Sequence, residues 1–99
     1  MAAADLRKLA VGDFEQRLDE TFTLKVPQLE LPLKLAKINR LGESGRPGGA
    51  FSLLFAAPPG PFLAQAIYPL EHAELGLLEI FLVPLGPRDG GNLYESIFT

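Results

Sequence analysis

The chain has a single histidine, His72, and the glutamates beside it make this the densest group of side chains that could carry chemistry. Glu71 and Glu74 could share a proton or a metal ion with the imidazole, because these residue types serve as general acids, general bases and zinc ligands. A zinc site usually takes about four protein or water ligands, and the chain has no second histidine and no cysteine. We therefore expect no metal ligand and no catalytic residue, with His72 capping a turn or meeting a carboxylate.

The remaining nucleophiles and glycine-rich segments fit no catalytic motif. Ser44, Ser52 and Ser96 lie outside any Gly-x-Ser-x-Gly turn, which is the turn that exposes a hydrolase nucleophile. The glycine-rich segment 45–49 lacks the Lys-Ser/Thr ending with which a phosphate-binding loop holds its ligand. We expect a protein that is not an enzyme and that binds no cofactor.

Length and charge restrict the remaining classes of protein. The 99 residues, 47% hydrophobic and 21% charged, predict one compact domain over residues 1–99. Residues 1–49 carry eight basic and seven acidic side chains, whereas residues 50–99 carry one basic and five acidic ones. A nucleic-acid partner needs a clustered basic face, so we expect none.

Residues 47–70 carry no charge, which is enough length for a membrane helix. The five prolines in this segment would leave backbone groups unpaired in a bilayer, so we expect two strands around a proline-rich turn and no membrane insertion. Charged residues interrupt residues 1–12, so no secretory signal is expected. The chain is predicted to be cytoplasmic at synthesis.

Alternation of apolar and polar residues predicts strands through most of the chain. Residues 21–26 and 29–35 alternate cleanly around Pro27 and Gln28, which predicts a hairpin. The pattern then slips by one position at Leu35 and Ala36, and a β-bulge there would bend the strand as a small barrel requires. Further strands are expected over residues 51–55, 66–70, 77–85 and 93–99, with a hairpin loop at residues 72–76.

The first 20 residues follow a helical spacing instead. Leu6 and Leu9 fit a short helix after Asp5, and Asp13 with Gln16 resembles a capping box before Phe14 and Leu18. The predicted fold is all-β, a small barrel or sandwich of about six antiparallel strands, in which this short N-terminal helical segment, residues 1–20, plugs or flanks the barrel.

Apolar residues exceed what one inward face of a small barrel needs. The expected interface residues are Phe62, Leu63, Phe81, Val83 and Ile97, because large exposed apolar patches mark contact surfaces. The competing interpretation is that the N-terminal helix and the proline-rich turn cover them. Residues 93–98 could also pair with another chain as an edge strand.

Several segments in a fixed order resemble a known family. They are FSLLF at 51–55, PFLAQ at 61–65, YPLEH at 68–72, EIFLVP at 79–84 and YESIF at 94–98. This pattern is similar to that of small uncharacterised bacterial domains that are often encoded near proteins resembling phage tail-collar domains. The chain departs from it at Asp19, where glycine is expected, and at residues 64–66.

The resemblance implies a domain of unknown function with an accessory or structural role. We expect a protein that assembles with itself or docks onto a larger bacterial tail-like or fibre assembly, so that it ends as part of an extracellular or tail-like particle. Its partner would be a tail-collar-like protein or a second copy. The alternative is a small barrel that holds an apolar ligand or peptide in its mouth near Tyr68 and Tyr94.

Overall fold

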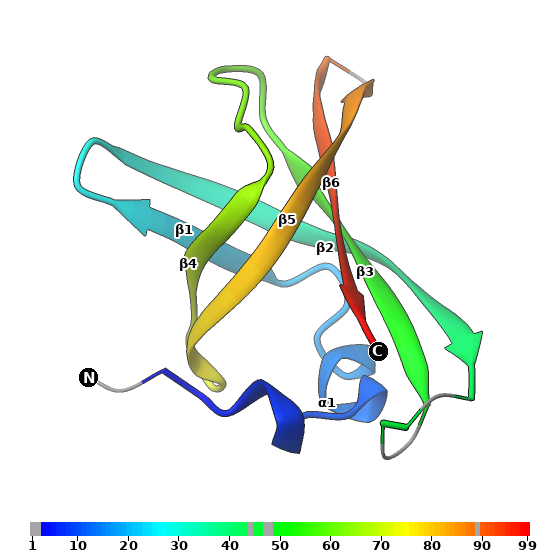
Figure 1. The fold of residues 1–99 in the computed structure, drawn as a ribbon. Coiled ribbons are helices and arrows are strands. Elements are labelled where there is room, and N and C mark those ends of the chain that lie inside the picture. The colour runs from blue at the N-terminus through cyan, green and yellow to red at the C-terminus, as the bar shows by residue number, and fades with distance from the viewer. Residues whose placement is uncertain (1–2, 44, 47–48, 89) are drawn as a thin grey trace.

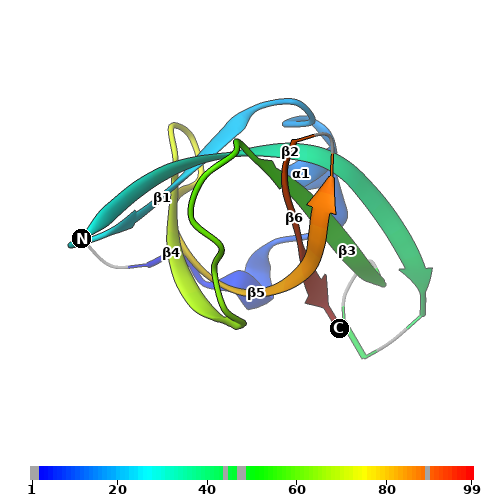
Figure 2. The same cartoon turned by 90° about the horizontal axis from the view of Figure 1, so that it is seen from above.

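Six antiparallel strands close on themselves in the computed structural model, which describes residues 3–43, 45–46, 49–88 and 90–99 (Figures 1 and 2). The strands are β1 (Thr21–Val26), β2 (Leu29–Gly42), β3 (Ala50–Ala57), β4 (Ala66–His72), β5 (Gly76–Arg88) and β6 (Gly91–Phe98). Their order around the barrel is β1-β2-β3-β6-β5-β4, with β4 paired to β1. The expected all-β barrel with about six antiparallel strands is confirmed.

The predicted bulge lies where the sequence pattern slips. Leu35 lies opposite Phe55 of β3 and Lys37 lies opposite Leu54, so Ala36 is the extra residue of β2. The bulge lets Leu35 point inward with no exposed surface and turns Lys37 outward on the same strand. An extra residue bends a strand and increases its twist, which allows the 14 residues of β2 to curve around the barrel.

Inward positions of the strands form one core. On β5, Leu78, Ile80 and Leu82 are fully buried while Phe81 between them is exposed. On β6, Tyr94 and Phe98 point inward as their shared phase predicts. The two phases of these strands therefore correspond to a buried and a more exposed face.

Two short helices precede the barrel. The 3₁₀ turn η1 (Leu6–Lys8) begins after Asp5, whose carboxylate accepts the Arg7 backbone N–H at 3.0 Å. The hydrogen bond from the Arg7 side chain lowers the pKa of the Asp5 carboxyl. The second helix, α1, spans Val11–Glu15.

The expected capping box is wrong in detail. Asp13 lies inside α1, and its carboxylate accepts the N–H of Ala10 at 2.8 Å, so it closes the first turn from within. The helix ends at Glu15, and Leu18 is therefore left 47% exposed instead of packing beside Phe14. A five-residue helix is too short to present residues 14 and 18 on one buried stripe.

The helix α1 lies below the strands in Figure 1, and its Phe14 plugs that end of the barrel. Its ring has no exposed surface, and its centroid lies 5.7 Å from that of Phe51 and 5.6 Å from that of Phe98. Arg46 stacks its guanidinium over the same Phe51 and Phe98 rings, at 5.5 and 5.2 Å. It also donates hydrogen bonds to the carbonyls of Leu6 and Leu9. Phe14 and Arg46 thus hold the N-terminal segment against the barrel. The Ala4 N–H, which donates to the Leu77 carbonyl at 2.8 Å, and the ion pair of Glu15 with Arg40 add to this contact.

The proline-rich turn closes the other end. Leu63, in the connection between β3 and β4, is buried, and its N–H donates to the Tyr94 hydroxyl at 3.0 Å. The Tyr68 hydroxyl donates to the Ala64 carbonyl at 2.6 Å. Both tyrosines of the expected ligand mouth are therefore bonded to the segment that covers it.

Asp19 adopts a φ of 70° between α1 and β1. This left-handed conformation favours glycine, which is the residue that the family resemblance led us to expect there. Asp and Asn tolerate it better than other side chains do. Along the described ranges, no helix has the length and apolarity needed to cross a membrane.

Replacing Gly91 by alanine is expected to destabilise the barrel. A Cβ at this position would lie 2.0 Å from the carbonyl oxygen of Ala57, so β3 and β6 would have to move apart. We predict a loss of about 2 to 4 kcal/mol in the free energy of unfolding, measured by urea denaturation. Gly12→Ala is the control, because nothing lies within 4 Å of its added Cβ and a helical Gly→Ala change gains up to about 1 kcal/mol. Equal stability of the two variants would contradict this packing.

Candidate functional site

The first candidate is the set of large apolar side chains on the outside of the barrel. Of the expected interface residues, Phe62 is 62% exposed, Phe81 46% and Ile97 55%, and Val83 is half-buried. Phe62 belongs to the proline-rich turn, which closes one end of the barrel. Neither that turn nor the N-terminal segment, which plugs the other end, covers Phe81 or Ile97.

Leu63 differs from the other four expected interface residues. It is only 8% exposed and packs in the core, because its loop folds back onto Tyr94. It therefore cannot contribute its side chain to an outer surface. The sequence offered no sign of this, since Leu63 lies in a turn without periodicity.

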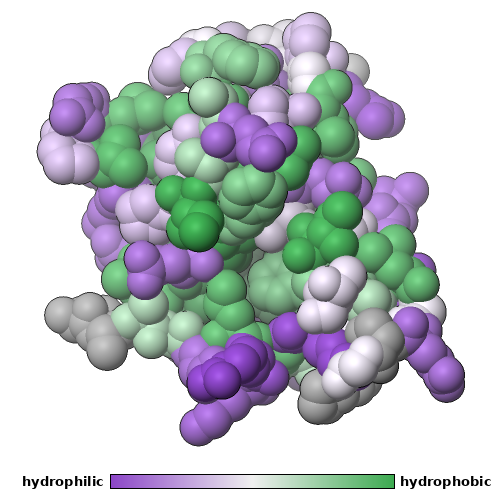
Figure 3. Space-filling view, in the orientation of Figure 1, coloured by the Kyte–Doolittle hydropathy of each residue, from purple (hydrophilic) through white to green (hydrophobic). Residues whose placement is uncertain are grey.

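Ile67 is an outer residue that the sequence analysis did not single out. It is 64% exposed on β4 and lies opposite Phe81 of β5. The sequence did indicate this position, because Ile67 lies between the inward Ala66 and Tyr68 and its side chain must point to the opposite face of the strand. We call Ile67, Phe81, Val83 and Ile97 the outer apolar face. Figure 3 shows hydrophobic residues gathered over β5 and its neighbours, with polar residues between them.

The barrel offers little backbone for strand addition. β6 pairs with β3 through residues 92–98 and with β5 through residues 91–95. The expected free edge at residues 93–98 is therefore mostly wrong, because strand closure satisfies its donors and acceptors on both sides. Contacts made by the outside of the barrel must rely on side chains.

His72 is the second candidate, and it anchors a loop. Its ring is almost fully buried and packs on Phe22, with ring centroids 4.5 Å apart. Nδ1 accepts the backbone N–H groups of Glu74 and Leu75 at 3.1 and 3.2 Å, and Nε2 lies 2.7 Å from a carboxylate oxygen of Glu20. Two donors at Nδ1 place the ring proton on Nε2, from which it is donated to Glu20. Both expectations for His72, the turn cap and the carboxylate partner, are confirmed.

Glu20, His72 and Glu74 are also the described groups that come close enough together to hold a metal ion, with ligand atoms within 4.8 Å of one another. The Arg17 guanidinium, 3.9 Å from Glu74, already supplies a positive charge there. Nδ1 is occupied by two backbone donors, and a cation at Nε2 would replace its hydrogen bond to Glu20. Glu71, the other acid expected near His72, lies 3.6 Å from Lys25 instead. The hydrogen bonds of His72 are those of a residue that anchors a loop.

A comparison with protein-family models identifies the family of the chain. The model of a domain of unknown function, DUF6916, matches residues 9–98. The chain belongs to this family. No curated protein and no solved structure matches the chain. The matched range leaves out η1 but includes α1 and all six strands of this DUF6916 domain.

His72→Ala is expected to lower the free energy of unfolding by about 2 kcal/mol or more, since it removes a buried ring and leaves two loop N–H groups without their acceptor. Glu20→Gln is the matched test of the tautomer. A glutamine oxygen can still accept from Nε2, so the change should cost less than about 0.5 kcal/mol. Urea denaturation of both variants measures these effects. A large loss in Glu20→Gln would instead indicate a charged His72–Glu20 pair.

Proposed function

We propose that this protein is a non-enzymatic building block that associates with a second copy of itself through the outer apolar face. The observation that carries the proposal is the exposure of Ile67, Phe81 and Ile97 at 46 to 64% on neighbouring strands, although the chain has its own segments to close both ends of the barrel. Large apolar side chains exposed together on neighbouring strands are typical of contact sites.

The apolar centre of this face favours a copy of the same chain as its occupant. Glu79 and Glu95, on β5 and β6, have no ion-pair partner among the described residues, and Glu95 lies opposite Val83. Exposed acids at a rim cost little in a contact, whereas the central apolar residues supply the affinity. A patch with an apolar centre is complementary to itself, as a two-fold dimer requires.

The larger assembly that we propose is a bacterial tail-like or fibre particle, with a tail-collar-like protein as the second partner. The support is the resemblance of segments 51–55, 79–84 and 94–98 to bacterial domains encoded near such proteins. Co-expression with a tail-collar-like protein from the same genome tests this partner. A complex that forms with the unmodified chain, and not after Phe81→Ser, would support it.

Removing two side chains of the outer apolar face should weaken self-association. For Phe81→Ser with Ile97→Ser we predict a dimer dissociation constant at least about tenfold higher, because each lost side chain removes more than about 1 kcal/mol of burial. Light scattering and sedimentation equilibrium over a concentration series measure it.

The matched control is Leu18→Ser with Leu41→Ser. These leucines are 47% and 51% exposed, close to the values for Phe81 and Ile97, but lie outside the outer apolar face. The control should associate as the unmodified chain does. A strictly monomeric unmodified chain at the highest attainable concentration would refute self-association.

A further inference from the structure

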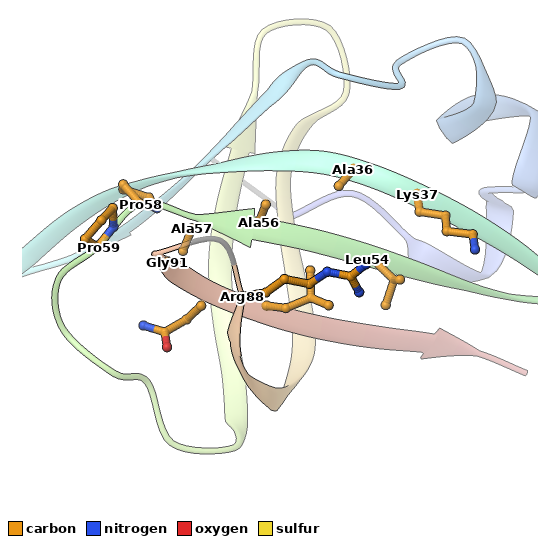
Figure 4. Close-up of a pocket in the computed structure, with 11 residues that line it drawn as sticks. Ala36, Lys37, Leu54, Ala56, Ala57, Pro58, Pro59, Arg88 and Gly91 are labelled. Carbon is orange, nitrogen blue, oxygen red and sulfur yellow. The ribbon is translucent and has the colours of Figure 1, made fainter.

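A groove lies on the outer wall of the barrel where β2, β3 and β6 run side by side (Figure 4). Its volume is about 420 Å³, within the range of about 300 to 1,000 Å³ that small-molecule sites occupy. Leu54, Ala56 and Leu93 give it an apolar floor, and Pro58 and Pro59 bound one end. This groove is separate from the barrel interior, which the core side chains fill.

Two cations line the groove. Lys37 comes from the bulged part of β2, and Arg88 from the end of β5. Figure 4 shows Arg88 reaching along the groove toward Leu54, on the side where Lys37 lies. Both are exposed, and neither forms an ion pair or hydrogen bond with any residue in the described ranges.

Most other basic side chains have acidic partners within the chain. Arg7, Arg17, Lys25, Lys34 and Arg40 each lie within 4.0 Å of a carboxylate. In an acidic protein with a formal charge of −3, two cations that form no ion pair within the described ranges and lie beside one apolar floor are a local complement to an anion.

We propose that this groove binds a small amphipathic carboxylate, with its apolar body on Leu54, Ala56 and Leu93 and its carboxylate between Lys37 and Arg88. The planar guanidinium of Arg88 suits a carboxylate because both oxygens can accept from it. The apolar floor supplies most of the contact area, while the cations determine the orientation and the charge of the ligand.

A polyanion fits this groove less well. Glu95 lies opposite Leu54 on the neighbouring strand and places a negative charge at the rim. The groove residues include no aromatic ring on which a base could stack, although such stacking is the usual platform for single-stranded nucleic acids. A single carboxylate is enough to pair with both Lys37 and Arg88.

Titration with octanoate tests the proposal. Backbone amide shifts in a ¹H–¹⁵N NMR spectrum should move for Ala56, Asn92 and Leu93 and stay unchanged around His72. Acetate keeps the charge without the tail, and 1-octanol keeps the tail without the charge, so each should bind at least about tenfold more weakly. Shifts scattered over the whole barrel, or equal binding of octanol, would overturn the proposal.

A second test removes the positive charges of the groove. Lys37→Gln with Arg88→Gln should weaken octanoate binding at least about tenfold, whereas Lys25→Gln with Lys34→Gln, the same charge change on paired lysines, should leave it within about twofold. Arg88→Lys should give an intermediate affinity.

A dispersed spectrum shows that each variant is folded. Unchanged binding in the first double variant, or binding of an acidic peptide with no response to octanoate, would refute the proposal. Neither outcome depends on self-association.

Discussion

Closing a six-stranded sheet on itself makes the inner side of every strand part of one interior, which the chain must fill and seal with its own side chains. Phe14 seals one end and Leu63, held by Tyr94, seals the other. Between them the inward positions of the strands form a continuous core. The helix α1 and the proline-rich turn are therefore needed to seal the two ends of the barrel.

The same constraint leaves the outside of the barrel without cover. Ile67, Phe81 and Ile97 stay exposed because the segments that could have shielded them lie at the ends. Closure also pairs most backbone groups of the strands, which removes the usual route by which β proteins join one another. A contact made by the outer wall would then depend on side chains, such as the apolar ones on β4 to β6 or the cationic ones beside β3.

Two-residue periodicity predicted the strands, their inward faces and the bulge at Ala36, because each of these depends on how apolar and polar residues alternate along a short segment. It did not predict the burial of Leu63 or the contact of Arg46 with two phenylalanines, because both residues lie in turns where no period exists. Lys37 and Arg88 are far apart in the chain and come together only through the strand order β2-β3-β6-β5. His72 was foreseen as a turn cap, but its partner Glu20 lies 52 residues away.

The two ends of the described chain leave the barrel from the same side. In Figure 1 the blue N-terminal segment and the final residues of β6 both lie at the end that Phe14 plugs, whereas the connection that contains Pro58 and Pro59 lies at the opposite end. A domain fused to either terminus would therefore stand beneath the barrel. The proline-rich turn would lie at the end of the barrel far from that domain, and the groove would open on the side wall.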